Sequence, residues 1–227
     1  MEGAPSRSGQ PEYSEMGDHL RTARRRRHLS LRDLAGRVGL SPSLISQVET
    51  GRARPSVSTL YAIANELDVS LDELLFNDAG RAGRSAEAPL AVLPAEPATP
   101  TAHAPGHPIQ RADDRKVIRL ASGVVWERLT TESVPGVDFL YVTYEVGGAS
   151  SPEHEFQRHG GHEWGVVISG RLGVTIGFDE HELGPGDSIS IDSTVPHRLY
   201  NRGTVPVHGI WFVLGRRSLD VPGLADT

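Results

Sequence analysis

The chain has 227 residues and carries 23 lysine and arginine residues against 29 aspartate and glutamate residues, a formal net charge of −6. It contains no cysteine, which excludes disulfides, thiolate metal sites and cysteine catalysis. No apolar run approaches the roughly 20 residues that a membrane span needs, so no membrane partner is expected, and the length favours two domains.

The N-terminal residues 1–14 lack the basic-then-apolar order of a signal peptide. We therefore expect them to be disordered and the protein to be cytoplasmic. A first helix is predicted over residues 17–28, where Leu20 and Ala23 are apolar and four consecutive arginines occupy positions 24–27.

The segment from Leu31 to Thr50 predicts two short helices separated by a tight turn. Gly39 stands where the first helix must stop, because a left-handed backbone conformation costs glycine little. Ser41 is placed to cap the second helix, with Pro42 in the first turn, where its missing N–H does no harm. Four apolar residues at helical spacing give the first helix one buried face: Leu31, Leu34, Ala35 and Val38.

The second of these helices is predicted to have an apolar face and a short polar face. The apolar face consists of Leu44, Ile45 and Val48, and the outward residues are Pro42, Ser43, Ser46 and Gln47. Such a face suits insertion into the major groove of DNA. The alternative for these twenty residues is an ordinary helical hairpin with a solvated face.

The flanking sequence favours the DNA-binding interpretation. Two further helices are predicted over residues 57–67 and 70–75, which makes five. Between Met16 and Ser56 the acidic residues are only Asp18, Asp33 and Glu49. The basic residues there are Arg21, Arg24, Arg25, Arg26, Arg27, Arg32, Arg37, Arg52 and Arg54. A locally positive segment in an acidic chain fits a surface that approaches phosphates.

Residues 39–51, followed by Pro55 and Ser56, closely resemble the phage-repressor-like, or XRE, helix-turn-helix family, and the similarity spans residues 16–76. The resemblance implies a transcriptional regulator that binds a pseudo-palindromic operator in double-stranded DNA as a homodimer. It places the four outward residues of the second helix at base edges, and Ser41 and Arg52 near the phosphate backbone.

One departure from the family concerns the phosphate contacts. Leu31 stands where phage repressors often carry a phosphate-binding glutamine, so that contact is expected to be missing. The run from Arg24 to Arg27, which includes Arg25, is the candidate to replace it by phosphate contact, although a solvated helix end is the alternative for each of these arginines. Arg54 is a further DNA-binding candidate. Among the base-reading candidates only Gln47 could make a bidentate contact, most naturally to adenine.

Residues 78–114 are rich in proline and alanine and lack apolar periodicity, so we predict a linker there between a DNA-binding domain (residues 15–77) and a second domain (115–217). A short tail, residues 218–227, follows. Beyond the linker the apolar period becomes that of short strands separated by Gly/Pro/Asp turns, which predicts an all-β antiparallel sandwich or barrel. The expected strands are residues 116–120, 124–129, 139–146, 164–168, 172–176, 188–191, 198–200 and 207–213.

Two phrases in this half resemble the paired motifs of the cupin superfamily. The first is His159-Gly-Gly-His-Glu163 followed by Gly170, and the second contains Gly186-Asp187 and runs through Pro196-His197 to Asn201. The resemblance implies a jelly-roll barrel. The fold class expected for the whole chain is thus an all-α five-helix domain followed by an all-β cupin.

The cupin resemblance places His159, Glu163 and His197 at three of the usual four metal-ligand positions, with Gln157 at the fourth in place of a histidine. Two imidazoles and a carboxylate can bind one divalent ion of iron, manganese, nickel or zinc. Strand alternation supports their convergence. The alternative is a metal-free pocket for an unknown small-molecule effector, lined by the same polar residues.

Two functions remain open at this point. One is a regulator whose cupin senses a small molecule, mediates dimerisation, or does both. The other is a cupin metalloenzyme with an accessory helix-turn-helix domain, because iron-dependent phosphonate epoxidases are similar in domain order and in a two-histidine, one-carboxylate site. The retained basic residues favour the non-enzymatic regulator. Alternation cannot say which of five candidate pocket residues face inward: Trp164, Phe178, Arg198, Tyr200 and Trp211.

Overall fold

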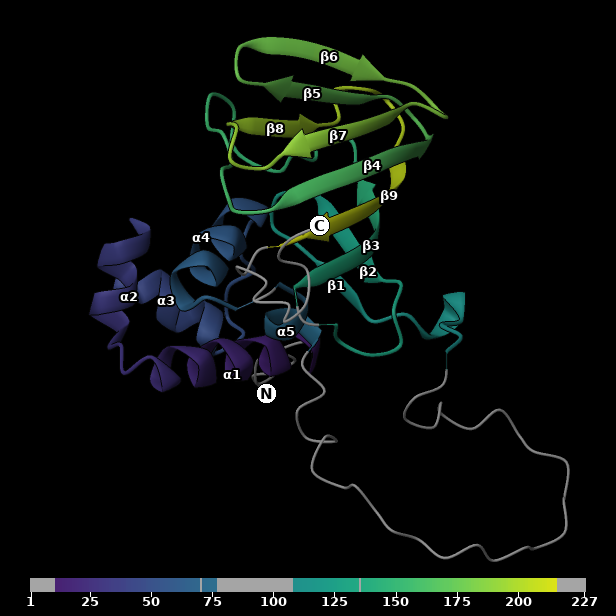
Figure 1. The fold of residues 1–227 in the computed structure, drawn as a ribbon. Helices are drawn as coiled ribbons and strands as arrows, with labels where there is room; N and C mark the ends of the chain where they lie inside the picture. The colour runs from purple at the N-terminus through teal and green to yellow at the C-terminus, as the bar shows by residue number, and fades with distance from the viewer. Residues whose placement is uncertain (1–10, 70, 77–107, 135, 216–227) are drawn as a thin grey trace, which may run out of the picture.

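The structure, a computed structural model, describes residues 11–69, 71–76, 108–134 and 136–215. A helical unit lies against a β-sheet unit that follows it in the chain (Figure 1). This confirms the expected order of the two parts. Most of the predicted linker and all of the predicted C-terminal tail lie outside the described residues; of the linker's described end, residues 112–114 form a 3₁₀ turn.

Four helices of two turns or more and one shorter helix make up the described helical unit. They are α1 (Pro11–Arg26), α2 (Leu31–Val38), α3 (Pro42–Glu49), α4 (Val57–Leu67) and the six-residue α5 (Leu71–Phe76). In the described part of the chain no helix is both long and apolar enough to cross a membrane.

The first helix begins earlier than predicted. It starts at Pro11 instead of Gly17, so residues 11–14 do not belong to a disordered N-terminus. The contacts that order this first turn are distant in sequence: Tyr13 and Met16 are buried, and the Tyr13 hydroxyl donates to the backbone oxygen of Arg119 at 2.7 Å.

The turn between α2 and α3 forms as predicted. Gly39 has a left-handed φ of 69°, and its N–H donates to the backbone oxygen of Ala35. Ser41 is extended and its Oγ accepts the N–H of Leu44 at 3.1 Å, with Pro42 at the start of the helix. These caps use backbone groups that a short helix would otherwise leave unpaired.

A buried ion pair joins α1 to α3. The Glu49 carboxylate is 4% exposed and accepts two bonds from the Arg24 guanidinium, Nε at 2.6 Å and Nη2 at 2.9 Å. Arg21 adds a longer contact at 3.4 Å. The helices approach so closely that a Cβ on Gly17 would lie 2.5 Å from the Glu49 carbonyl oxygen. The sequence pattern had grouped Arg24 with the DNA-facing arginines.

The β unit has two antiparallel sheets. The larger has the order β1-β2-β3-β9-β4-β7 and the smaller β6-β5-β8. The strands are β1 (Val117–Arg119), β2 (Val124–Arg128), β3 (Val137–Tyr144), β4 (His162–Ser169), β5 (Leu172–Ile176), β6 (Asp179–Leu183), β7 (Ser188–Asp192), β8 (His197–Tyr200) and β9 (Val207–Leu214). Eight coincide with predicted strands; β6 was not predicted, because its exposed residues Asp-Glu-His-Glu show no apolar alternation.

The inner faces of the sheets meet in a core that also contains polar side chains. Along β4 the burial alternates strictly, so Glu163, Gly165 and Val167 point inward while Trp164 and Val166 point outward. Glu163 of the larger sheet lies 3.1 Å from the ring of His197 of the smaller one. The site residues thus lie between the two sheets.

The helical unit and the β unit are in direct contact. The N–H of Ala121, in the β1–β2 turn, donates to the backbone oxygen of Pro55 at 3.0 Å, just before α4. On α4 itself, the Tyr61 ring packs edge-on against Trp126 of β2, with centroids 6.1 Å apart. Together with the bond from Tyr13, these contacts dock α1 and α4 on the β unit.

Because the Arg24–Glu49 pair is buried, replacing Arg24 should destabilise the helical unit. Arg24→Ala leaves the Glu49 carboxylate with only the longer Arg21 contact. We expect the free energy of unfolding to fall by about 3–5 kcal/mol, towards the lower end because Arg21 remains. Urea denaturation followed by circular dichroism measures the change. The exposed neighbour substitution Arg25→Ala should stay within about 0.5 kcal/mol of wild type; equal losses in the two variants would show that the pair contributes no special stability.

Candidate nucleic-acid interface and candidate metal centre

The outward face of α3 contains the four residues that were predicted to read bases. Pro42, Ser43 and Gln47 are exposed and Ser46 is half-buried, whereas Ile45 and Val48 lie in the core. The Gln47 amide nitrogen lies 3.5 Å from the hydroxyl of Ser43, one helical turn away. The side chains therefore form one short polar strip along α3.

The predicted phosphate-contacting arginines divide into two groups. Arg25 and Arg52 are exposed, and Arg54 is exposed with its guanidinium 5.0 Å from the centre of the Tyr13 ring. Arg24 is buried against Glu49, and hydrogen bonding to that carboxylate raises the pKa of Arg24. Its guanidinium is turned into the protein, so the prediction that Arg24 contacts phosphate is wrong.

Two other arginines of the basic segment are also engaged in ion pairs. Arg27 lies 2.7 Å from Asp68, and Arg37 lies 2.8 Å from Glu66. Both acidic partners lie beyond Ser56, outside the window over which the basic excess was counted. The positive surface is therefore smaller than the sequence indicated.

In the β unit, three residues predicted as metal ligands come together. His159, Glu163 and His197 each offer one ligand atom, and all three atoms lie within 4.8 Å of one another. The Glu163 Oε1 atom is 3.0 Å from His159 Nε2 and 3.1 Å from His197 Nε2. All three side chains are almost completely buried. The predicted convergence is present.

The second ring nitrogens determine what the cluster can bind. His159 Nδ1 lies 3.0 Å from the backbone oxygen of Gly160, and His197 Nδ1 lies 2.9 Å from that of Val195. A carbonyl oxygen only accepts, so each Nδ1 carries a hydrogen. A neutral imidazole then presents its Nε2 lone pair to Glu163, and three electron-pair donors face one another.

Such an arrangement requires positive charge, either protons on the imidazoles or a cation between them. Burial alone would raise the pKa of Glu163, but the hydrogen bonds from His159 and His197, and their positive charge when protonated, lower it below its ordinary value. Donor atoms bound to one ion at about 2.0–2.2 Å are about 3 Å apart when they subtend a right angle. The observed separations of 3.0 and 3.1 Å match this spacing and equally match hydrogen bonds from protonated imidazoles, so the distances accommodate either source of positive charge.

Two side chains hold the carboxylate in place: Ser193, which the sequence did not indicate, and Trp211, one of the five candidate pocket residues. Ser193 Oγ donates to Glu163 Oε1 at 3.0 Å, and Trp211 Nε1 donates to Oε2 at 3.2 Å. Gly165 makes room for the indole, because a Cβ there would overlap the Trp211 ring. The alternation of residues along β9 could have predicted that Trp211 points inward. No local pattern in the sequence indicates that Ser193 belongs to the site.

Gln157, the fourth predicted ligand, lies beside His197. The backbones of the two residues exchange both hydrogen bonds, at 2.8 and 3.0 Å, which puts their side chains on the same face. Gln157 is 5% exposed, and its Nε2 atom has no hydrogen-bond partner among the described residues. A buried amide donor is thus left available at the edge of the cluster.

Tyrosines form another side of the site. Tyr144 of β3 is buried, and its burial, with nearby Tyr61 and Glu163, raises its pKa well above the ordinary value. Tyr61, from α4 of the helical unit, stacks on the ring of His159 with centroids 4.3 Å apart and an angle of 16° between the planes. No sequence pattern indicated that contact, because it joins separate domains.

The other candidate pocket residues lie elsewhere. Trp164 is 40% exposed on the outer face of β4, and Phe178 is fully exposed in the β5–β6 turn. Tyr200 is buried, with the guanidinium of Arg198 4.6 Å from its ring centre. Only Trp211 among the five contacts the carboxylate of the cluster.

Comparison with known proteins identifies both parts of the chain. A helix-turn-helix family model, HTH_3, matches residues 20–74, and a cupin domain model, Cupin_2, matches residues 140–213. The HTH-type transcriptional regulator PuuR of Escherichia coli (strain K12) is 27% identical over 187 residues, which cover 82% of this chain and 86% of PuuR. The HTH-type transcriptional regulator SutR of the same strain is 23% identical over 83% of this chain and 88% of SutR.

A solved structure of an HTH_3 family transcriptional regulator from Vibrio cholerae is also similar. It superposes with a TM-score of 0.63 at 19% identity, over 92% of this chain and 100% of that one. At this identity the likeness establishes the shared fold of a helix-turn-helix domain joined to a β domain.

Proposed function

The chain is an XRE-type helix-turn-helix transcriptional regulator with a C-terminal cupin domain, and we propose that it is a homodimeric, metal-dependent sensor of a small molecule. The observation that carries this proposal is the buried meeting of His159, Glu163 and His197 with both Nδ1 atoms bonded to carbonyl oxygens. The site responds to a ligand, and the helical domain reads an operator.

In the proposed DNA complex α3 enters the major groove. Its capped N-terminus and polar strip support this role, with base contacts from Pro42, Ser43, Ser46 and Gln47. Phosphate contacts come from Ser41, Arg25, Arg52 and Arg54. We leave Arg24 out of the interface because its side chain is buried. Gln47 is the residue that distinguishes adenine from other bases.

The proposed metal is a divalent ion of iron, manganese, nickel or zinc. Imidazole and carboxylate ligands suit all four, so the donor set does not select one of them. His159, Glu163 and His197 would hold the ion, with the Gln157 side chain as a candidate fourth ligand. When bound, the ion supplies a Lewis-acidic position at which an oxygen or nitrogen atom of the effector can coordinate.

The chemistry of Gln157 supports a particular class of effector. Its amide nitrogen is buried without a partner among the described residues, which is a costly state for a donor. An effector with an anionic or carbonyl oxygen would satisfy this donor. We therefore propose a small molecule with a carboxylate or a similar oxygen acceptor.

Regulation is favoured over catalysis by the helical domain. An accessory domain in an enzyme has no need of an exposed DNA-reading face, whereas here α3 keeps a capped, polar outer face beside exposed Arg25, Arg26 and Arg52. The ion pairs of Arg24, Arg27 and Arg37 reduce the positive surface. The three exposed arginines remain available for contact with phosphates.

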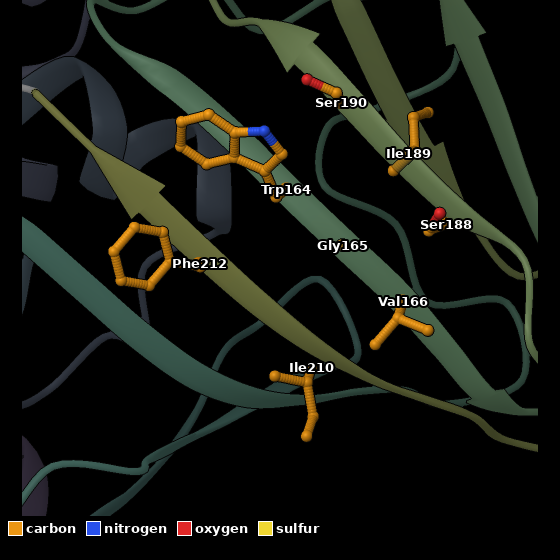
Figure 2. A pocket seen from close by; sticks show the side chains of 8 residues that line it. All are labelled: Trp164, Gly165, Val166, Ser188, Ile189, Ser190, Ile210 and Phe212. Carbon is orange, nitrogen blue, oxygen red and sulfur yellow. The ribbon is translucent and has the colours of Figure 1, made fainter.

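Dimerisation is proposed to use the outer face of the six-stranded sheet. Three consecutive outward residues of β4 are apolar and exposed: Trp164 (40%), Val166 (36%) and Ile168 (47%). A shallow hollow of about 560 Å³ lies on this face, and none of the eight residues that line it is charged. Trp164 and Phe212, two of these residues, lie on the neighbouring strands β4 and β9 (Figure 2). A large exposed apolar patch marks an interaction surface. A second copy of the chain is the occupant that a pseudo-palindromic operator requires.

The base-reading role of Gln47 predicts a loss confined to specific DNA. An operator is first selected from a pool of random duplexes. Gln47→Ala should reduce the favourable free energy of binding to the selected operator by about 1–3 kcal/mol and leave binding to random DNA unchanged. Fluorescence anisotropy across a salt series measures both. As a matched control, Arg25→Ala should weaken binding to both DNAs alike and reduce the salt slope by about one. If Gln47→Ala weakened both DNAs equally, Gln47 would not read bases.

The metal proposal predicts a stoichiometric ion. Elemental analysis of the purified full-length protein should find about one divalent ion per chain, because all three donors converge on one point. His197→Ala should lose the ion. His208→Ala is the matched control, since that histidine bonds to Thr143 and is not in the cluster. Removal of the ion by a chelator should change operator affinity; a metal-free wild-type protein would contradict the proposal.

The dimer proposal predicts that a charge on the outer face separates the chains. Trp164→Glu should weaken the dimer by at least about 2 kcal/mol, because a carboxylate would be buried in an apolar interface. Sedimentation velocity at several concentrations measures the change. Phe178→Glu, at a fully exposed aromatic in the β5–β6 turn, is the control and should remain dimeric. A dimer of Trp164→Glu as tight as the wild type would place the interface elsewhere.

A further inference from the structure

We infer that Tyr61 makes the His159/Glu163/His197 cluster a two-domain site, so that a cation bound there and the docking of the DNA-binding domain stabilise each other. This inference rests on the proposed metal function and assigns a regulation to that site. Its basis is the stacking of a side chain from α4 on a proposed metal ligand (4.3 Å, 16°).

The Tyr61 ring is buried where α4 meets the cupin domain. It is 8% exposed, lies face to face with His159 and meets Trp126 edge-on at 89°. The His159 ring therefore has Tyr61 on one face, while its Nε2 atom points to Glu163. A tyrosine of the helical unit thus covers a ring whose nitrogen belongs to the cluster.

Docking at this point is fixed by hydrogen bonds at the N-terminal end of α4. The N–H of Ala121 donates to the Pro55 oxygen at 3.0 Å, and the N–H of Val57 donates to the hydroxyl of Ser122 at 3.5 Å. Tyr13 adds the bond to Arg119 from α1. Tyr61 consequently cannot leave His159 without disturbing contacts between the two domains.

The charge on the His159 imidazole connects the binding of a cation to the docking of the helical domain. A cation at Nε2 withdraws electron density from the His159 ring, and an electron-poor ring stacks more favourably on the electron-rich phenol. The cation therefore strengthens the stack. By thermodynamic reciprocity the docked domain raises the affinity for the cation by the same factor.

The same helix transmits the state of the site to the DNA-reading helix. Leu60 and Ile63 of α4 lie in the core of the helical unit, and Glu66 pairs with Arg37 of α2 at 2.8 Å. Since α2 and α3 are joined by a tight turn, the position of α4 on the cupin sets the position of α3. In a dimer joined through the cupins, docking of α4 thus determines the spacing of the two reading helices, which operators require to be about 34 Å.

The test measures Co(II) binding to the full-length protein by competition with a chromophoric chelator. Tyr61→Leu keeps an apolar side chain but removes the aromatic ring, and it should weaken Co(II) binding at least about fivefold, the lower end of typical couplings. Tyr61→Phe keeps the ring and should stay within about twofold of wild type. Tyr141→Leu removes a tyrosine from the outer face of β3 and should not change the affinity.

A second readout separates coupling from a merely structural role. Hydrogen exchange at the Ala121 amide, which bonds to Pro55, should slow on addition of Co(II) in the wild type and in Tyr61→Phe, but not in Tyr61→Leu. If Tyr61→Leu fails to fold by circular dichroism, Tyr13→Phe replaces it. That variant weakens docking away from the cluster and should also lower Co(II) affinity.

The outcomes distinguish this inference from the function on which it rests. A wild-type protein that takes up no Co(II) would overturn both. If the Tyr61→Leu variant binds Co(II) as tightly as the wild type and shows the same exchange response, the coupling alone is overturned. Tyr13→Phe takes its place in this comparison where Tyr61→Leu does not fold. Fivefold weaker binding in Tyr61→Leu together with a lost exchange response supports the coupling.

Discussion

The enclosure of the Glu163 carboxylate between two sheets is the constraint on which the rest of the cupin half depends. A carboxylate without water must receive hydrogen bonds or positive charge, because its desolvation is otherwise prohibitive. Glu163 receives two neutral donors, from Ser193 and Trp211, and faces two imidazoles. Glu163 and Trp211 belong to the larger sheet and His197 to the smaller one, so the charge can be accommodated only when the two sheets are packed together.

A second buried carboxylate plays a comparable role in the helical half. Glu49 ends α3, and its partners Arg24 and Arg21 lie on α1, so α3, the proposed DNA-reading helix, is held to the first helix by charge as well as by apolar contact. The two cases differ in their partners. Arginine is permanently charged and satisfies Glu49 by itself, whereas histidine is neutral over much of the physiological range and leaves Glu163 dependent on a proton or a metal ion.

The sequence predicted the features that arise from neighbouring residues. The caps at Ser41 and Gly39 and eight of the nine described strands follow from local backbone chemistry and apolar periodicity. What it missed depends on distant contacts. Arg24 is indistinguishable from Arg25 in sequence, and only the position of Glu49 on α3 makes one buried and the other exposed. Strand β6 is an edge strand with charged residues, a composition that protects sheet edges and carries no apolar signal.

The contact between the two domains was beyond local prediction for the same reason, and it bears on the kind of function that the site can have. An enzyme that turns over must admit substrate and release product repeatedly, so a cover supplied by a separate domain would have to open in each cycle. A sensor benefits from such a cover, because a ligand that favours the covered or the uncovered state shifts the position of the whole domain. The stacking of Tyr61 on His159 connects the cluster directly to α4, which packs in the same helical unit as α3. This connection is of use to a regulator whether the site holds a metal, an effector or both.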